Sequence, residues 1–125
     1  MRRTDDGGSM TVVTVGVVAI AATLAATLGV AGGVAVAETR AQGAADAAAL
    51  AVAFDARDRR ALGAAYVGTG AAPCRIAVEV SGRWGAHLVA CSVEPGGIVS
   101  VEVAVSTCVG AVGAEATAGP SLGER

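Results

Sequence analysis

The sequence contains no lysine, and it has only one Trp, one Tyr and one Phe among 125 residues. All nine basic residues are therefore arginines; they are scattered, and the formal net charge is −2. Nucleic-acid binding requires cations gathered on one face, so we expect no nucleic-acid partner. The apolar residues are mainly Ala and Val, whose small side chains each bury little area. We therefore expect a thin core that benefits from a cross-link.

A convergent cluster of polar residues is also missing. The glycines near 68–70 and 96–97 lack the lysine and the context of a phosphate-binding loop. The single His87 and the three cysteines are widely spread, without metal-ligand spacing such as C-x-x-C. We expect no enzyme, no cofactor and no metal site, and we interpret His87 as an exposed strand residue. The alternatives are a metal site built from His87 and the cysteines, and an enzyme that uses His87 with a cysteine.

A long uncharged segment stands near the N-terminus. No charged residue occurs from Gly7 to Ala37, and about 28 residues of helix, at about 1.5 Å each, exceed the roughly 30 Å hydrocarbon core of a bilayer. We therefore predict a leader or cytoplasmic segment at 1–8, a transmembrane helix at 9–37 and one extracytoplasmic domain at 38–125. Arg2 and Arg3 precede the helix, which favours a cytoplasmic N-terminus in a single-pass cell-membrane protein.

The same segment has a second interpretation. Ala35-Val36-Ala37 resembles a signal-peptidase site, so cleavage after Ala37 would release a small secreted binding or effector protein. The apolar segment is about twice as long as the roughly 7–15 apolar residues of a signal peptide, which favours a retained anchor. A buried helix is disfavoured, because so small a domain cannot surround it.

Small residues recur at four-residue spacing along this helix. Such a ridge allows another helix to approach closely in lipid, although a segment rich in Ala and Gly also produces ridges by chance. The predicted helix-packing residues are Ala21, Ala25, Gly29, Gly33 and Ala37.

Helical composition continues beyond Glu38, where Ala dominates. Apolar residues including Ala45, Val52 and Phe54 fall toward one side, which predicts an outer helix packed on a small sheet. The Gly-rich segment that ends at Pro73 predicts a helix end at about Ala65 to Val67.

The remainder of the chain has strand patterns. Alternating residues in 75–80 predict a strand, although a short helix fits the segment too. Two apolar runs around Glu94-Pro95-Gly96-Gly97 predict a β-hairpin with one buried face, and 114–118 predicts an edge strand before a tail that frays. The fold class is therefore α+β, with a long N-terminal transmembrane helix that continues into an outer helix on a small antiparallel sheet.

The cysteines and the tryptophan have structural interpretations. A disulfide between Cys74 and Cys91 would stabilise a thin core by about 3 kcal/mol. Cys108 would then be the odd thiol, and one sequence does not settle the pairing. Trp84, the one tryptophan, is interpreted as a lid over the small core, with a contact anchor as the alternative.

Three parts of the chain together resemble the TadE-like pseudopilins, specifically the small actinobacterial proteins of secretion and tight-adherence pilus loci. The first is Gly7-Gly8-Ser9 directly before the apolar helix. The second is the block from Arg40 to Ala51, with Gln42 and Ala45-Asp46. The third is Cys74, Gly85-Ala86-x-Leu88 and Cys91 before the alternating valines.

The resemblance implies a pilin-like minor pseudopilin or membrane-anchored accessory subunit of a tight-adherence pilus or a type II/IV-like secretion system. Prepilin peptidase would remove a leader between Gly8 and Ser9, and the implied partners are membrane lipid and other pseudopilins or secretion-machine subunits, contacted through the apolar helix. The family also favours a helix at 74–81. Counted from Ser9, Val13 stands where type IV pilins carry a glutamate.

Overall fold

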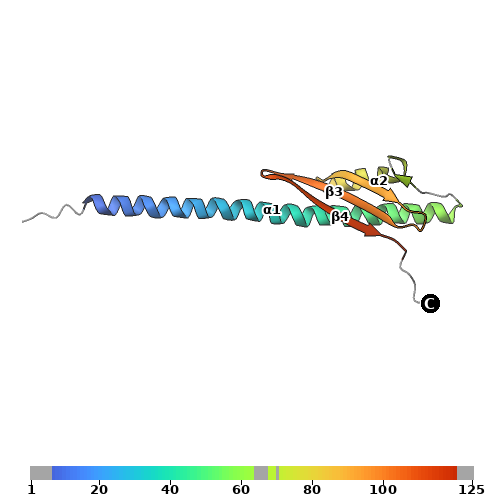
Figure 1. Cartoon of the computed structure of the whole chain (residues 1–125), viewed down its shortest axis with the longest axis horizontal. Helices are drawn as coiled ribbons and strands as arrows, with labels where there is room; N and C mark the ends of the chain where they lie inside the picture. The colour runs from blue at the N-terminus through green and yellow to red at the C-terminus, as the bar shows by residue number, and fades with distance from the viewer. Residues whose placement is uncertain (1–6, 64–67, 70, 121–125) are drawn as a thin grey trace, which may run out of the picture. The chain divides into compact units, whose positions relative to one another are not determined.

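The fold is that of a computed structural model, which describes residues 7–63, 68–69 and 71–120. The elements follow the order α1 (Gly7–Ala61), β1 (Gly68–Thr69), α2 (Ala71–Arg83), β2 (His87–Val93), β3 (Val99–Thr107) and β4 (Gly110–Ala118) (Figure 1). Contacts divide the chain into two compact units, Met1–Gly33 and Val34–Arg125. The fold is α+β, as the sequence predicts.

The first unit consists of the N-terminal part of α1. Its large apolar side chains are exposed, from Met10 at 79% to Val30 at 45%. The hydroxyls of Thr14, Thr23 and Thr27 donate to backbone carbonyls one turn earlier, as Thr14 Oγ1 does to Met10 O at 2.8 Å and Thr27 Oγ1 to Leu24 O at 2.9 Å. These bonds satisfy the hydroxyls within the helix itself, as a nonpolar solvent requires.

In the second unit, residues 34–61 of α1 pack on the sheet through a stripe of small side chains. Helical spacing of three and four residues brings these positions onto one face. The opposite side of the interface is formed by alternate valines of β3: Val99, Val101 and Val103 are fully buried, and Val105 nearly so. The buried residues of α1 are Ala37, Ala41, Ala44, Ala45, Ala48, Ala49, Val52 and Ala56.

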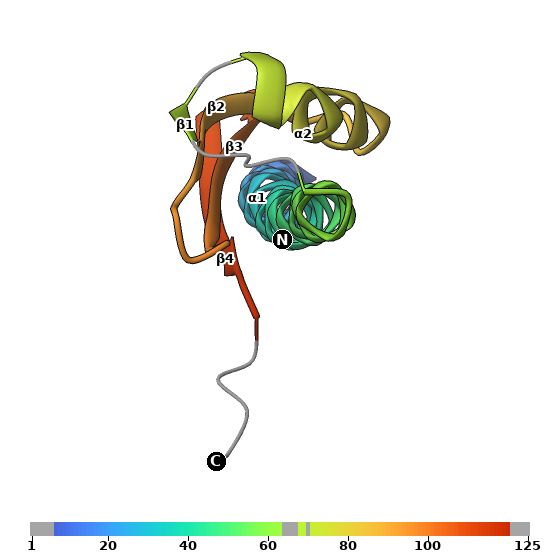
Figure 2. The same cartoon turned by 90° about the vertical axis from the view of Figure 1, so that its right-hand side faces the viewer.

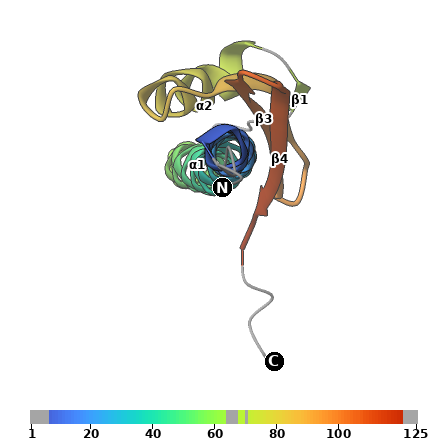
Figure 3. The ribbon, with the colours of Figure 1, turned by 90° about the vertical axis from the view of Figure 1, so that its left-hand side faces the viewer.

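The sheet is antiparallel, with the strand order β1-β2-β3-β4. The β2–β3 register pairs Cys91 with Val101 and Val93 with Val99, and a bulge lies between Leu88 and Ala90. The hairpin closes where Glu94 N donates to Ile98 O at 2.8 Å and Gly97, at φ 82°, donates to Glu94 O. The predicted hairpin with one buried face is confirmed. Viewed along α1 (Figures 2 and 3), the later part of α1 lies against one face of the sheet, and α2 lies beside both the helix and the sheet.

The strand predicted at 75–80 is wrong, and the alternative of a short helix is the one observed, because this segment belongs to α2. Its buried positions include Cys74, Ala77 and Ser81, which are separated by three and four residues, while Val78 is 56% exposed. The alternation of polar and apolar residues therefore does not correspond to inner and outer faces here. Helical spacing instead directs the small residues inward and leaves Val78 and Glu79 outside.

Three other predictions are resolved in this unit. α1 ends at Ala61, before the predicted 65–67, and Gly63 (φ 79°) caps it by donating to Arg60 O. The edge strand predicted at 114–118 is present and longer, as β4. Phe54, predicted on the packed side of the outer helix, is 61% exposed, because it follows the buried Val52 by only two residues. The predicted end at 65–67 and most of the fraying tail lie outside the described residues.

Candidate functional surfaces

The apolar part of α1 is the first candidate surface. Among the described residues, α1 is the one helix long and apolar enough to cross a membrane, and its most apolar stretch is entirely exposed. A helix that is apolar on every side is typical of a membrane span. The chain is therefore compatible with a single-pass membrane anchor.

The predicted helix-packing residues divide between the two units. Ala21, Ala25, Gly29 and Gly33 are exposed on α1, whereas Ala37 is 6% exposed and belongs to the core of the outer domain. A Cβ atom added at Gly29 or Gly33 would meet nothing within 4 Å. No packing among the described residues therefore requires glycine there, and contact with a partner helix at this ridge stays a prediction.

The candidate cleavage residues all lie within α1. Gly8 and Ser9 are in its first turn, and Ala35-Val36-Ala37 lies in its interior. Signal-peptidase cleavage after Ala37 would cut a continuous helix at a buried residue, and it would separate Ala37 from the core to which it contributes.

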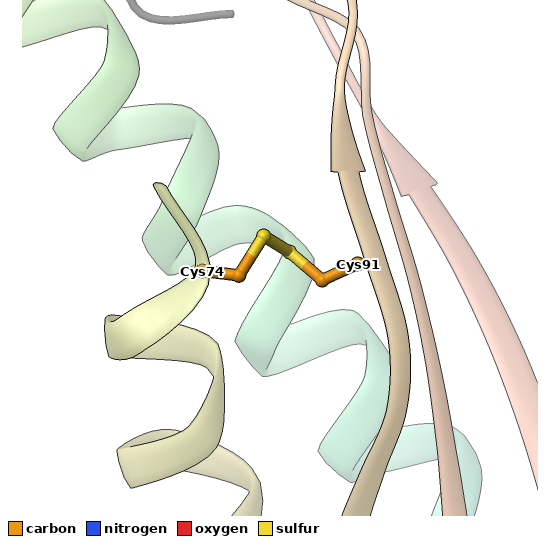
Figure 4. The surroundings of a disulfide bond; sticks show 2 residues. All are labelled: Cys74 and Cys91. Carbon is orange, nitrogen blue, oxygen red and sulfur yellow. A yellow bond between two sulfur atoms is a disulfide. The ribbon is translucent and has the colours of Figure 1, made fainter. Parts of the chain in front are cut away.

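The sulfur atoms of Cys74 and Cys91 are joined in a disulfide, the pair favoured by the sequence analysis (Figure 4). Cys74 lies in α2 and Cys91 on the inner face of β2, with their Cα atoms 6.0 Å apart. Both side chains point into the space between α2 and β2, Cys74 from the buried face of the helix and Cys91 from the inner face of the strand, so their sulfur atoms meet there. The bond connects α2 to the central part of the sheet, and it leaves Cys108 free and exposed in the β3–β4 turn.

The alternatives involving metal or thiol chemistry gain no support from this geometry. Two of the three cysteines form the disulfide and have no free thiol that could bind a metal or react. His87 is exposed at the first residue of β2, consistent with its interpretation as an exposed strand residue. Within the described ranges, no group of three or more His, Cys, Asp or Glu side chains is placed to hold a metal ion.

Trp84 covers residue 43 of α1. A Cβ atom at Gly43 would lie only 2.9 Å from Trp84 Cζ3 and 3.3 Å from Cη2. This contact agrees with the lid interpretation, yet the side chain remains 46% exposed. Trp84 also lines a hollow of about 430 Å³ with Ala35, Val36, Thr39 and Arg40.

Sequence reasoning missed a groove near the C-terminal end of α1. Its volume is about 620 Å³, and its lining includes the exposed Leu50 and Phe54, together with Arg57, Arg60 and Pro120. The Arg60 guanidinium extends over Gly97 and donates to Pro95 O at 3.4 Å. Gly97 of the hairpin turn is buried and has φ 82°, and a Cβ atom there would lie 2.8 Å from Arg60 Nη2. Glycine therefore leaves room for Arg60, but no pattern in the sequence indicates this contact.

Comparison of the chain with protein-family models, with curated proteins and with solved structures gives no match in any of the three.

Proposed function

We propose that the chain is a membrane-anchored, pilin-like subunit, a minor pseudopilin or accessory component of a tight-adherence or type II/IV-like secretion machine. It acts through helix packing and surface contact, and it does not catalyse a reaction. In this proposal the apolar part of α1 stays in the cell membrane, the N-terminus is cytoplasmic, and the outer domain lies outside the cytoplasm.

The observation that supports the proposal is that the two parts of α1 have surfaces of different kinds. In the described part of the first unit, α1 exposes large apolar side chains, and the hydroxyls of Thr14, Thr23 and Thr27 are bonded within the helix. The later part of α1 is the alanine-faced core helix of an α+β domain. A helix of this kind can be stored in a bilayer and can later pack against neighbouring helices. The Cys74–Cys91 disulfide adds support, because such bonds persist mainly outside the cytoplasm.

The proposed partners follow from the same surfaces. The apolar part of α1 would contact membrane lipid first, and it would then contact other pseudopilins or secretion-machine subunits. Prepilin peptidase would cleave between Gly8 and Ser9. The alternative of a secreted protein released after Ala37 is disfavoured by the burial of that residue in the core.

The test is the N-terminal residue and cell fraction of the protein from its native host, determined by intact mass and fractionation. A chain that begins at Ser9 in the membrane or sheared-filament fraction is the expected result. A membrane-bound chain with an intact Met1 would retain the anchor and contradict pilin-type processing. A soluble extracellular chain that begins at Glu38 would overturn the anchor.

A further inference from the structure

One end of the outer domain carries exposed apolar side chains, and two of them, Val36 and Trp84, line a hollow together with Arg40. The α2–β2 junction and the β3–β4 turn lie at the same end of the sheet, because β2 and β3 are antiparallel and His87 pairs with Ala104. Val36, Trp84 and Val109 are all exposed there, by 59%, 46% and 62%. Trp84 and residues 35–40 of α1 surround the hollow of about 430 Å³.

The backbone holds Trp84 firmly in this position. Gly85, at φ 70°, donates to Gly82 O, and Ala86 N donates to Ser81 O, both at 3.0 Å. This pattern is a Schellman motif, which fixes Trp84 as the residue directly before the left-handed glycine. One edge of the indole rests against Gly43, while the rest of the ring stays exposed. Trp84 is therefore a half-exposed aromatic residue whose backbone belongs to a defined helix cap.

Arg40 supplies a cation beside this ring. It lines the same hollow, and its side chain has no ion pair or hydrogen bond with any residue in the described part of the chain. The neighbouring Arg83, by contrast, is paired with Glu79 at 2.6 Å. Arg40 is also the first basic residue after the uncharged segment that ends at Ala37.

We infer that Trp84 and Arg40 form a contact with the bilayer interface, the indole among the headgroups and the guanidinium on lipid phosphate. Trp is enriched at this depth of a membrane because it is large and apolar yet carries one N–H donor, and a long arginine side chain can reach from apolar surface to phosphate. The inference rests on the proposed membrane anchor. The bilayer is favoured over a protein partner because the hollow follows directly on the apolar segment along α1.

The experiment uses the sole tryptophan as its probe. The whole chain is reconstituted into vesicles of phosphatidylcholine and phosphatidylglycerol, in which part of the lipid is brominated near the headgroup end of the acyl chains. Trp84 is expected to lose most of its fluorescence to these lipids and to be shielded from aqueous acrylamide. The matched control is the single-tryptophan variant W84F/F54W, since Phe54 is exposed on α1 at about 25 Å along the helix from Ala37. It should show the opposite pattern.

A second variant tests the cation. Arg40→Gln should weaken quenching of Trp84 in vesicles that contain phosphatidylglycerol, and the loss should be smaller in pure phosphatidylcholine. Flotation of the vesicles separates the two proposals. If the chain floats with the vesicles but acrylamide quenches Trp84 as strongly as it quenches the tryptophan of the W84F/F54W variant, the interfacial contact is wrong and the membrane anchor stands. If the chain does not float with the vesicles, both the contact and the anchor are wrong.

Discussion

Trp84 and Gly43 form a contact in which the absence of a side chain on α1 makes room for the indole on the α2–β2 junction. A Cβ atom at residue 43 would approach Trp84 Cζ3 to 2.9 Å. Glycine inside a helix is less stable than alanine by roughly 0.5–1 kcal/mol. Gly43 therefore lowers the stability of α1, and it leaves space for the indole of Trp84.

The first prediction concerns this contact. Gly43→Ala should leave the free energy of unfolding nearly unchanged or lower it, because overpacking of about 1–3 kcal/mol opposes the gain in helix propensity. In a Trp84→Ala background the same change should stabilise by about 0.5–1 kcal/mol. Denaturant unfolding of the four chains in detergent, combined as a double-mutant cycle, measures the coupling. Equal effects in both backgrounds would show that the two residues are not coupled.

The second prediction concerns the disulfide. Replacing both Cys74 and Cys91 by Ser should lower the free energy of unfolding by about 3 kcal/mol, because the bond closes a loop with a sequence separation of 17. Denaturant unfolding checks the value. Cys108→Ser is the matched control, since this exposed thiol is outside the bond and its removal should change the stability little. A C74S/C91S chain as stable as the control would argue against the cross-link.

The third prediction compares two glycines at the end of α2. Gly85 has φ 70°, a conformation that costs an L-residue roughly 1–2 kcal/mol, so Gly85→Ala should destabilise by about that amount. Gly82 is helical, and a Cβ atom there meets nothing within 4 Å. Gly82→Ala should therefore stabilise by about 0.5 kcal/mol. Thermal unfolding followed by circular dichroism distinguishes the two, and destabilisation by both would contradict the assigned cap.

The fourth prediction concerns two like charges across the outer face of the sheet. Glu102 of β3 and Glu115 of β4 are directly paired in the register, and both are exposed. Facing carboxylates are unfavourable, so Glu115→Gln should stabilise by about 0.5 kcal/mol, and Glu115→Arg by more through an opposite-charge pair. The gains should shrink as salt is added. Glu94→Gln, in the hairpin turn, serves as the control; a salt-independent gain would point to another cause.

The fifth prediction tests the topology through Cys108. This free thiol is exposed in the β3–β4 turn, so a membrane-impermeant maleimide should modify it on intact cells. The Cys108→Ser chain should remain unmodified until the disulfide is reduced. Modification that appears only after the cells are permeabilised would place the outer domain in the cytoplasm.

The sequence predicted the elements whose periodicity matches one buried face. The valines of β3 alternate from Val99 to Val105, and the turn residues at 94–97 mark the hairpin, so both could be located. The long uncharged segment from Gly7 to Ala37 likewise allowed the first part of α1 to be predicted from the sequence. The small α+β domain then follows from the number and type of these elements.

Tertiary packing determined the parts that were missed. Arg75 to Val80 alternates as a strand would, but the small residues Cys74, Ala77 and Ser81 are what α2 buries, and alternation carries no information about which small residues are covered. The hollow beside Trp84 joins residues more than 40 positions apart, and Arg60 reaches Pro95 across 35 positions. No local pattern encodes such neighbours, so these surfaces needed coordinates.

The alanine face of α1 restricts how this domain can change over time. Seven of the eight buried residues that α1 contributes are alanines, so hardly any of them can be shortened except to glycine. Any enlargement would press against the valines of β3 and separate helix from sheet. Adaptation to new partners is therefore confined to positions outside this interface, such as the outer sheet face and the turns, where substitutions leave the spacing of the two layers intact.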